Sequence, residues 1–87
     1  MLDFEDVFNS KIRLKVLKLL FMYGQMNTSN IACKLKVNYR LALTNLELLE
    51  RETILEKRSC GRTRFFRFAN TNKAQATLQV LEEWERG

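Results

Sequence analysis

The chain has 87 residues, of which 46% are hydrophobic, and a formal net charge of +5. This length predicts one domain spanning residues 1–87, and the hydrophobic fraction is too high for a disordered chain. No apolar run approaches the roughly 20 residues of a membrane span, and the acidic residues near the N-terminus are the wrong charge for a signal peptide, so we expect a cytoplasmic protein without a membrane partner.

Cations and acids are segregated along the sequence. Seven lysines and arginines lie in the stretch from Lys11 to Arg40, and five more lie in the stretch from Lys57 to Arg67. Neither stretch contains an acidic residue. Such segregation is typical of a face that binds a polyanion. The alternatives are a solvated basic surface or attraction to anionic lipid.

The chain has two cysteines and no histidine. Two cysteines make neither a disulfide framework nor a four-ligand zinc site within one chain. Cys33 falls among helical residues and is expected to pack inside the domain, whereas Cys60 falls in a predicted turn and is expected to be exposed. No nucleophile–base constellation is visible, so we expect neither an enzyme nor a cofactor.

The first predicted helix covers about residues 3–23. Its opening turns carry Phe4, Val7 and Phe8 at helical spacing, and they form either a short docking helix or part of this longer one. The rest of this helix has apolar residues around most of its circumference. We therefore expect it to be buried on more than one side, against this domain or against a second subunit. Gly24 is expected to end it, because glycine tolerates a positive φ.

A helix over residues 28–36 is predicted next, and after a tight turn a helix over residues 38–51. Thr28 and Asn38 are the expected N-caps, since their side-chain oxygens can accept a hydrogen bond from a free backbone N–H group. Two helices joined in this way predict a helix-turn-helix, although similar pairs also occur in all-α domains that bind no nucleic acid.

The helix over residues 38–51 has two distinct faces. Ala42, Leu46 and Leu49 share one side at helical spacing and predict the buried face. Its first turn, which begins with Asn38 and Tyr39, is left on other faces. Polar and cationic side chains in the first turn of an exposed helix suit contacts with base edges and phosphates.

A β-hairpin is predicted over residues 54–69, because its two arms are rich in aromatic and branched residues at alternating positions. Gly61 is expected to supply the positive φ of the turn. Phe66 and Phe68 are assigned to the core. The arginines around the turn make this hairpin a basic wing that can lie along a phosphate backbone or reach into a minor groove, with a solvated hairpin as the alternative.

The last predicted helix covers residues 72–86. Ala74, Leu78, Leu81 and Trp84 lie along one flank and need cover. We expect this flank to form a dimer interface with a second copy of the chain. The alternative is that it packs inside its own domain against the first helix.

Taken in order, these elements resemble the winged helix-turn-helix of the small ArsR-type transcriptional regulators, in their archaeal and archaeal-virus forms. The resemblance covers about residues 9–69 and is carried by residues 9–20, 27–37, 46–50, 54–57 and 61–67. It implies an α+β, mostly α fold: a winged helix-turn-helix with a two-stranded β-hairpin wing and a C-terminal dimerisation helix.

The resemblance also implies a homodimer that places paired recognition helices in successive major grooves of double-stranded DNA. It carries the DNA-reading and wing roles onto eight residues: Asn38, Tyr39, Arg40, Leu43, Thr44, Arg58, Arg62 and Arg64. Lys34 and Lys36, just before the recognition helix, are expected to meet the DNA backbone.

The sequence departs from the ArsR-type pattern at three points. Metal-sensing members bind ions through Cys, His and carboxylate clusters, whereas this chain has only Cys33 in the relevant helix and no histidine, so no metal is expected. Thr53 stands where a glycine is usual. Leu43 is apolar where such helices are usually polar; it either touches a thymine methyl group or faces protein.

The leading interpretation is a sequence-specific, homodimeric DNA-binding transcription regulator. A sequence-tolerant architectural DNA-binding protein would need only the basic faces. A winged-helix protein–protein adaptor would be supported by Leu43 and Phe65, if both are exposed, but not by the segregated positive charge.

Overall fold

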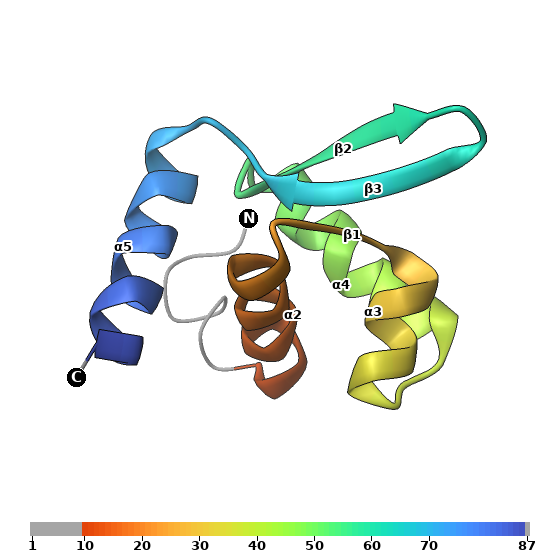
Figure 1. The fold of residues 1–87 in the computed structure, drawn as a ribbon, viewed down its shortest axis with the longest axis horizontal. Coiled ribbons are helices and arrows are strands. Elements are labelled where there is room, and N and C mark those ends of the chain that lie inside the picture. The colour runs from red at the N-terminus through yellow and green to blue at the C-terminus, as the bar shows by residue number, and fades with distance from the viewer. Residues whose placement is uncertain (1–9, 87) are drawn as a thin grey trace.

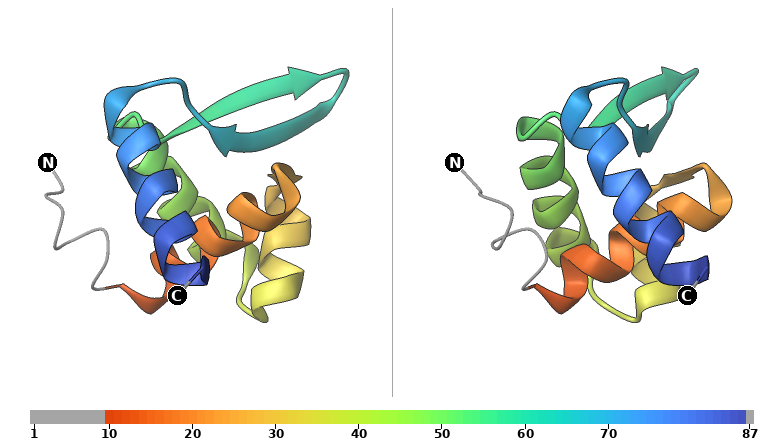
Figure 2. Two further views of the ribbon diagram at one scale, coloured as in Figure 1. Left: turned by 60° about the vertical axis from the view of Figure 1, so that its left-hand side comes forward. Right: turned by 90° about the vertical axis from the view of Figure 1, so that its left-hand side faces the viewer.

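The computed structural model describes residues 10–86, which are mostly helical and carry one antiparallel sheet (Figure 1). In chain order the elements are α2 (Lys11–Tyr23), β1 (Gln25–Asn27), α3 (Thr28–Leu35), α4 (Tyr39–Arg51), β2 (Leu55–Cys60), β3 (Thr63–Phe68) and α5 (Asn72–Arg86). The order of helices and hairpin is the predicted one. The hairpin of β2 and β3 extends away from the helices in both views of Figure 2.

Helix α2 begins later than the sequence predicted. Ser10 has an extended backbone, and its hydroxyl accepts a hydrogen bond from the backbone N–H of Arg13 at 3.3 Å. This N-cap starts the helix at Lys11, so a single helix running through Ser10 from about residue 3 is wrong. The apolar residues of the expected docking segment, before residue 10, lie outside the described residues. At the other end Gly24 has the expected positive φ, and its N–H donates to the carbonyl of Leu20.

The sheet contains a strand that the sequence analysis treated as a connector. β1 pairs antiparallel with β3, so the strand order is β1-β3-β2 and the wing is part of a three-stranded sheet rather than a free two-stranded hairpin. Met26 is buried in β1 opposite Phe66. A segment of three residues is too short for an alternating pattern to be recognised, which explains the omission.

One of the two predicted helix caps is confirmed. Asn38 accepts a hydrogen bond from the N–H of Leu41 at 2.7 Å and caps α4. Thr28, however, is the first residue of α3 and is buried, while Asn27 accepts from the N–H of Asn30 at 2.8 Å. Asparagine at the end of β1 already has the extended backbone that an N-cap requires, so the cap lies one residue earlier than expected.

The core lies between α2, α3, α4 and the inner face of the sheet. The predicted face of α4 is confirmed, since Ala42, Leu46 and Leu49 are fully buried. Phe66 is buried at the centre of the sheet, and Phe68 packs partly buried against the same core. Side chains from every layer meet here, so the position of the sheet relative to the helices is set by packing.

The turn from α4 into β2 forces Thr53 into a left-handed conformation with φ +65°. This region is unfavourable for a β-branched residue, so the glycine that the resemblance to ArsR-type regulators leads us to expect here would fit this turn better. We expect Thr53→Gly to raise the free energy of unfolding by about 0.5–1 kcal/mol, after allowing for the greater freedom of glycine in the unfolded chain.

Urea unfolding of the two proteins would measure this change. The Thr71 hydroxyl donates a hydrogen bond to the backbone carbonyl of Thr53 at 2.7 Å. Because glycine keeps this carbonyl, the substitution does not remove the bond. Thr63→Gly is the matched control, because Thr63 lies in β3 and a strand glycine should destabilise. An unfolding midpoint that does not rise in Thr53→Gly would contradict the strain argument.

Candidate nucleic-acid interface

The first turn of α4 is the exposed end of the helix-turn-helix. Tyr39 is 54% exposed, and Asn38 and Arg40 are also exposed. Arg40 and Thr44 lie one helical turn apart on the side of α4 away from the buried Ala42. The five residues of this helix that were expected to read DNA are therefore accessible, with Leu43 half-buried at the edge of the core.

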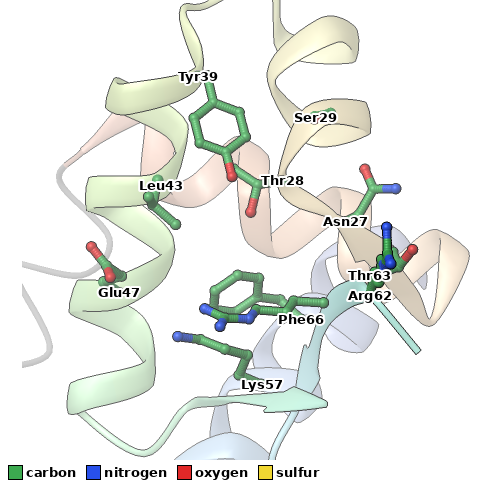
Figure 3. Close-up of a pocket in the computed structure, with 11 residues that line it drawn as sticks. Asn27, Thr28, Ser29, Tyr39, Leu43, Glu47, Lys57, Arg62, Thr63 and Phe66 are labelled. Atoms are coloured by element: carbon green, nitrogen blue, oxygen red, sulfur yellow. The ribbon is translucent and has the colours of Figure 1, made fainter. Parts of the chain in front are cut away.

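A groove of about 580 Å³ separates α4 from the wing (Figure 3). It is lined by residues from the start of α3, one side of α4 and the hairpin: Asn27, Thr28, Ser29, Tyr39, Leu43, Glu47, Lys57, Arg62, Thr63, Arg64 and Phe66. The groove thus brings together Tyr39 and Leu43 of α4 with two of the predicted wing arginines. Residues far apart in the sequence meet here because β3 crosses the middle of the sheet.

The wing carries three exposed arginines: Arg58, Arg62 and Arg64. Gly61 has φ +63° and forms the turn between β2 and β3, as predicted. None of these three side chains makes an ion pair within the described residues, so their charge is directed at solvent or at a ligand.

The other two cations of the hairpin are neutralised. Lys57 lies 3.8 Å from a carboxylate oxygen of Glu50, and Arg67 lies 2.5 Å from Glu56 across the strand pair. The charge of the wing is therefore concentrated at its outer half, where Arg58, Arg62 and Arg64 lie.

The lysines at the end of α3 are exposed but do not line the groove. The Lys34 ammonium lies over the ring of Tyr23, 5.1 Å from its centre. Lys36 ends the helix in a left-handed conformation, φ +58°, and stands two residues before the Asn38 cap. The groove meets α3 at its opposite end, at Thr28 and Ser29. The structure therefore places Lys36 beside the start of α4, and Lys34 away from the wing.

Several expectations from the sequence are corrected by side-chain positions. Arg13 is one of the seven cations counted between Lys11 and Arg40 as part of a basic face. It is half-buried, and its guanidinium donates a hydrogen bond to the Asn45 side-chain oxygen at 3.4 Å. Cys33 was expected inside the domain and is exposed; Cys60 is exposed as predicted. Phe65, which was the support for an adaptor surface together with Leu43, is only partly accessible.

Sequence reasoning also missed members of the groove. Glu47 was not included among the expected site residues, although it follows Leu43 by one turn and Tyr39 by two. That spacing was the available signal. Thr28 and Ser29 could not be found in this way, because their place in the groove depends on the pairing of β1 with β3, which sets where the hairpin lies relative to the start of α3.

The apolar flank of α5 is divided between the core and the surface. Ala74 is fully buried and Leu81 is 3% exposed within a single copy of the chain, and α5 packs against α2. Contrary to the expectation, these two side chains therefore have no free surface to offer a dimer partner. Leu78 is half-buried, and Trp84 is 73% exposed. A hollow of about 540 Å³ on this outer side is lined by Ala76, Gln79, Val80, Glu83 and Trp84.

Within residues 10–86 no three cysteine, aspartate or glutamate side chains gather in a way that could hold a metal ion. None of the helices that the structure describes is both long enough and apolar enough to cross a membrane.

Comparison of the sequence with protein-family models and with curated proteins gives no match. Solved structures do match. The homodimeric winged helix-turn-helix DNA-binding domain Mb0332 from Mycobacterium bovis, described as a possible ArsR-family transcriptional regulator, is 25% identical with a TM-score of 0.76, over 91% of this chain and 72% of that one.

Two further structures are similar in fold. HlyU from Vibrio cholerae N16961 is 16% identical with a TM-score of 0.76, over 93% of this chain and 86% of that one. A possible transcriptional regulator for arsenical resistance is 23% identical with a TM-score of 0.75, over 95% and 83% of the two chains. The chain is therefore a winged helix-turn-helix protein whose fold resembles that of ArsR-type regulators.

Proposed function

We propose that this protein is a sequence-specific transcription regulator that binds double-stranded DNA as a homodimer. The observation that carries the proposal is the groove between the exposed start of α4 and the wing, which Arg62 and Arg64 line. Within residues 10–86 neither arginine makes an ion pair. Its similarity to a domain described as DNA-binding supports the same function. A helix and a cationic wing on either side of one groove suit a major groove and its adjacent phosphates.

In this proposal the start of α4 enters the major groove. Asn38, Tyr39 and Arg40 are the candidates for base-edge and phosphate contacts, with Leu43 and Thr44 one turn further along. The wing arginines bind phosphates or the minor groove, and Lys36 meets the backbone beside the recognition helix.

Binding to the duplex can be tested by fluorescence anisotropy against a randomised pool and then against the enriched sequence, at several salt concentrations. We expect a palindromic site with half-sites about 10 base pairs apart, bound at least ~10³-fold more tightly than random DNA. Equal and steeply salt-dependent binding to every sequence would instead indicate an architectural protein. Absence of binding at low salt would refute the DNA-binding proposal.

We place the dimer contact on the outer side of α5. Trp84 and Val80 are large apolar side chains that are 73% and 40% exposed, and they lie together beside the hollow of this helix. Aromatic side chains of this kind are frequent energetic centres of protein interfaces. The inner residues Ala74 and Leu81 then support the interface indirectly, by holding α5 on its own domain.

Trp84→Ala is expected to weaken the dimer roughly thirtyfold or more, since loss of an interface centre costs about 2 kcal/mol or more. Sedimentation equilibrium at several concentrations would measure the dissociation constant. Gln75→Ala, an exposed position of α5 that does not line the hollow, is the control and should leave the dissociation constant unchanged. A wild-type protein that is monomeric at high concentration would rule out this interface.

A further inference from the structure

Glu47 brings a negative charge into an otherwise cationic groove. It follows Leu43 by one turn of α4 and Tyr39 by two, and all three lie along the side of the helix that borders the groove (Figure 3). Among the residues that line the groove, Glu47 is the one acid, and the other charged side chains there are Lys57, Arg62 and Arg64.

The neighbouring acids are occupied, whereas Glu47 is available. Glu50 lies 3.8 Å from Lys57, and Glu56 lies 2.5 Å from Arg67. Glu47 is exposed, and within residues 10–86 its carboxylate has neither an ion pair nor a side-chain hydrogen bond. Lys57, the lysine that lines the groove, pairs with Glu50 and not with Glu47. The carboxylate therefore faces whatever molecule occupies the groove.

A bare carboxylate beside DNA is unfavourable, because the duplex carries one negative charge for about every 1.7 Å of its length. A hydrogen bond donated to the carboxylate by a base edge would offset this repulsion. In the major groove guanine and thymine present acceptors, and adenine presents its amino donor beside the N7 acceptor. Cytosine presents its N4 amino donor without a neighbouring acceptor of its own, so it is the base that a carboxylate fits best.

We infer that Glu47, given the proposed DNA-binding function, accepts a hydrogen bond from the N4 amino group of a cytosine and selects a C·G pair in each half-site. Leu43, one turn nearer the start of α4, has an apolar side chain at the edge of the same groove. It suits a thymine methyl group near that cytosine. Glu47 also disfavours DNA that offers only acceptors at this position, so it contributes to specificity by repulsion as well as by attraction.

The test is enrichment from a randomised duplex pool by the wild type, Glu47→Gln and Glu85→Gln, followed by titration of the enriched site and its single-base variants. Glu85 is an exposed acid on α5 that does not line the groove. Glu85→Gln therefore removes the same charge at a position where no contact with DNA is proposed. The wild type and Glu85→Gln should both require one cytosine in each half-site, and replacing it should weaken binding about ten- to hundredfold.

Glu47→Gln should lose the preference for that cytosine and bind random duplexes several-fold more tightly than the wild type. Retention of the same cytosine with the same ratio would overturn the inference, even though the protein would still be a DNA-binding regulator. A wild type without any sequence preference would refute the proposed function itself. Thermal unfolding checks that the variant is folded, and Glu47→Ala provides a second removal of the carboxylate at this exposed helical position.

Discussion

Phe66→Ala is expected to lower the free energy of unfolding by about 3–5 kcal/mol, the largest effect that we expect from a single substitution in this chain. Phe66 is 1% exposed and heads the fully buried side chains by volume. It lies in β3, the middle strand, opposite Met26 of β1 and Lys57 of β2. Truncation would leave a cavity between the sheet and the helices, and the close-packed surroundings could fill it only in part.

Equilibrium unfolding in urea would measure the loss. A domain of this length has roughly 4–13 kcal/mol of stability in total, so the variant should unfold at a much lower urea concentration and could be largely unfolded at 37 °C. Phe65→Ala is the matched control in the same strand: Phe65 points to the other side of the sheet and is partly exposed, so its loss should cost far less. Equal losses for the two variants would contradict the assignment of the core.

The same residue connects the fold to the candidate interface. Phe66 lines the groove, and the Lys57 ammonium lies 5.8 Å from the centre of its ring. The position of the wing relative to α4 therefore depends on a side chain that belongs to the core. Where Phe66→Ala remains folded, we expect the wing to be less well positioned relative to α4. The variant should then lose more affinity for DNA than its unfolded fraction explains.

Much of the fold could be predicted because long helices repeat their signal. The buried stripe of α4 recurs over about two turns, and the wing has an aromatic arm, β3, that follows Gly61. β1 has three residues and could not be recognised by period. The choice of Asn27 over Thr28 as a cap depends on the extended backbone that β1 imposes, and this is a consequence of pairing with β3.

The candidate site was predicted less completely for a related reason. Exposure of Asn38, Tyr39 and Arg40 follows from the buried face of one helix, which a sequence pattern contains. Whether Leu81 faces its own domain or a partner depends on where α5 packs, and no local pattern distinguishes these alternatives. Apolar spacing shows that a flank is covered but does not show what covers it.

Arg40→Ala is expected to weaken binding to the preferred DNA site by roughly 1–3 kcal/mol per half-site and to relax the preference at one base position. Arg40 is exposed in the first turn of α4, on the side away from the core, and makes no ion pair within the described residues. An arginine in this place can bind the O6 and N7 acceptors of guanine with both arms of its guanidinium group. Its removal should therefore be felt most on the enriched site and least on random DNA.

Arg62→Ala is the matched control, because it removes the same charge from the tip of the wing. A contact with a phosphate carries no sequence information, so this variant should weaken binding to all duplexes to a similar degree and reduce the slope of log K against log salt by about one unit. Anisotropy titrations of both variants on the enriched and random duplexes at several salt concentrations separate the two roles. If Arg40→Ala instead lost the same factor on every duplex, Arg40 would be a backbone contact, and base reading by α4 would have to rest on its neighbours Asn38, Tyr39 and Glu47.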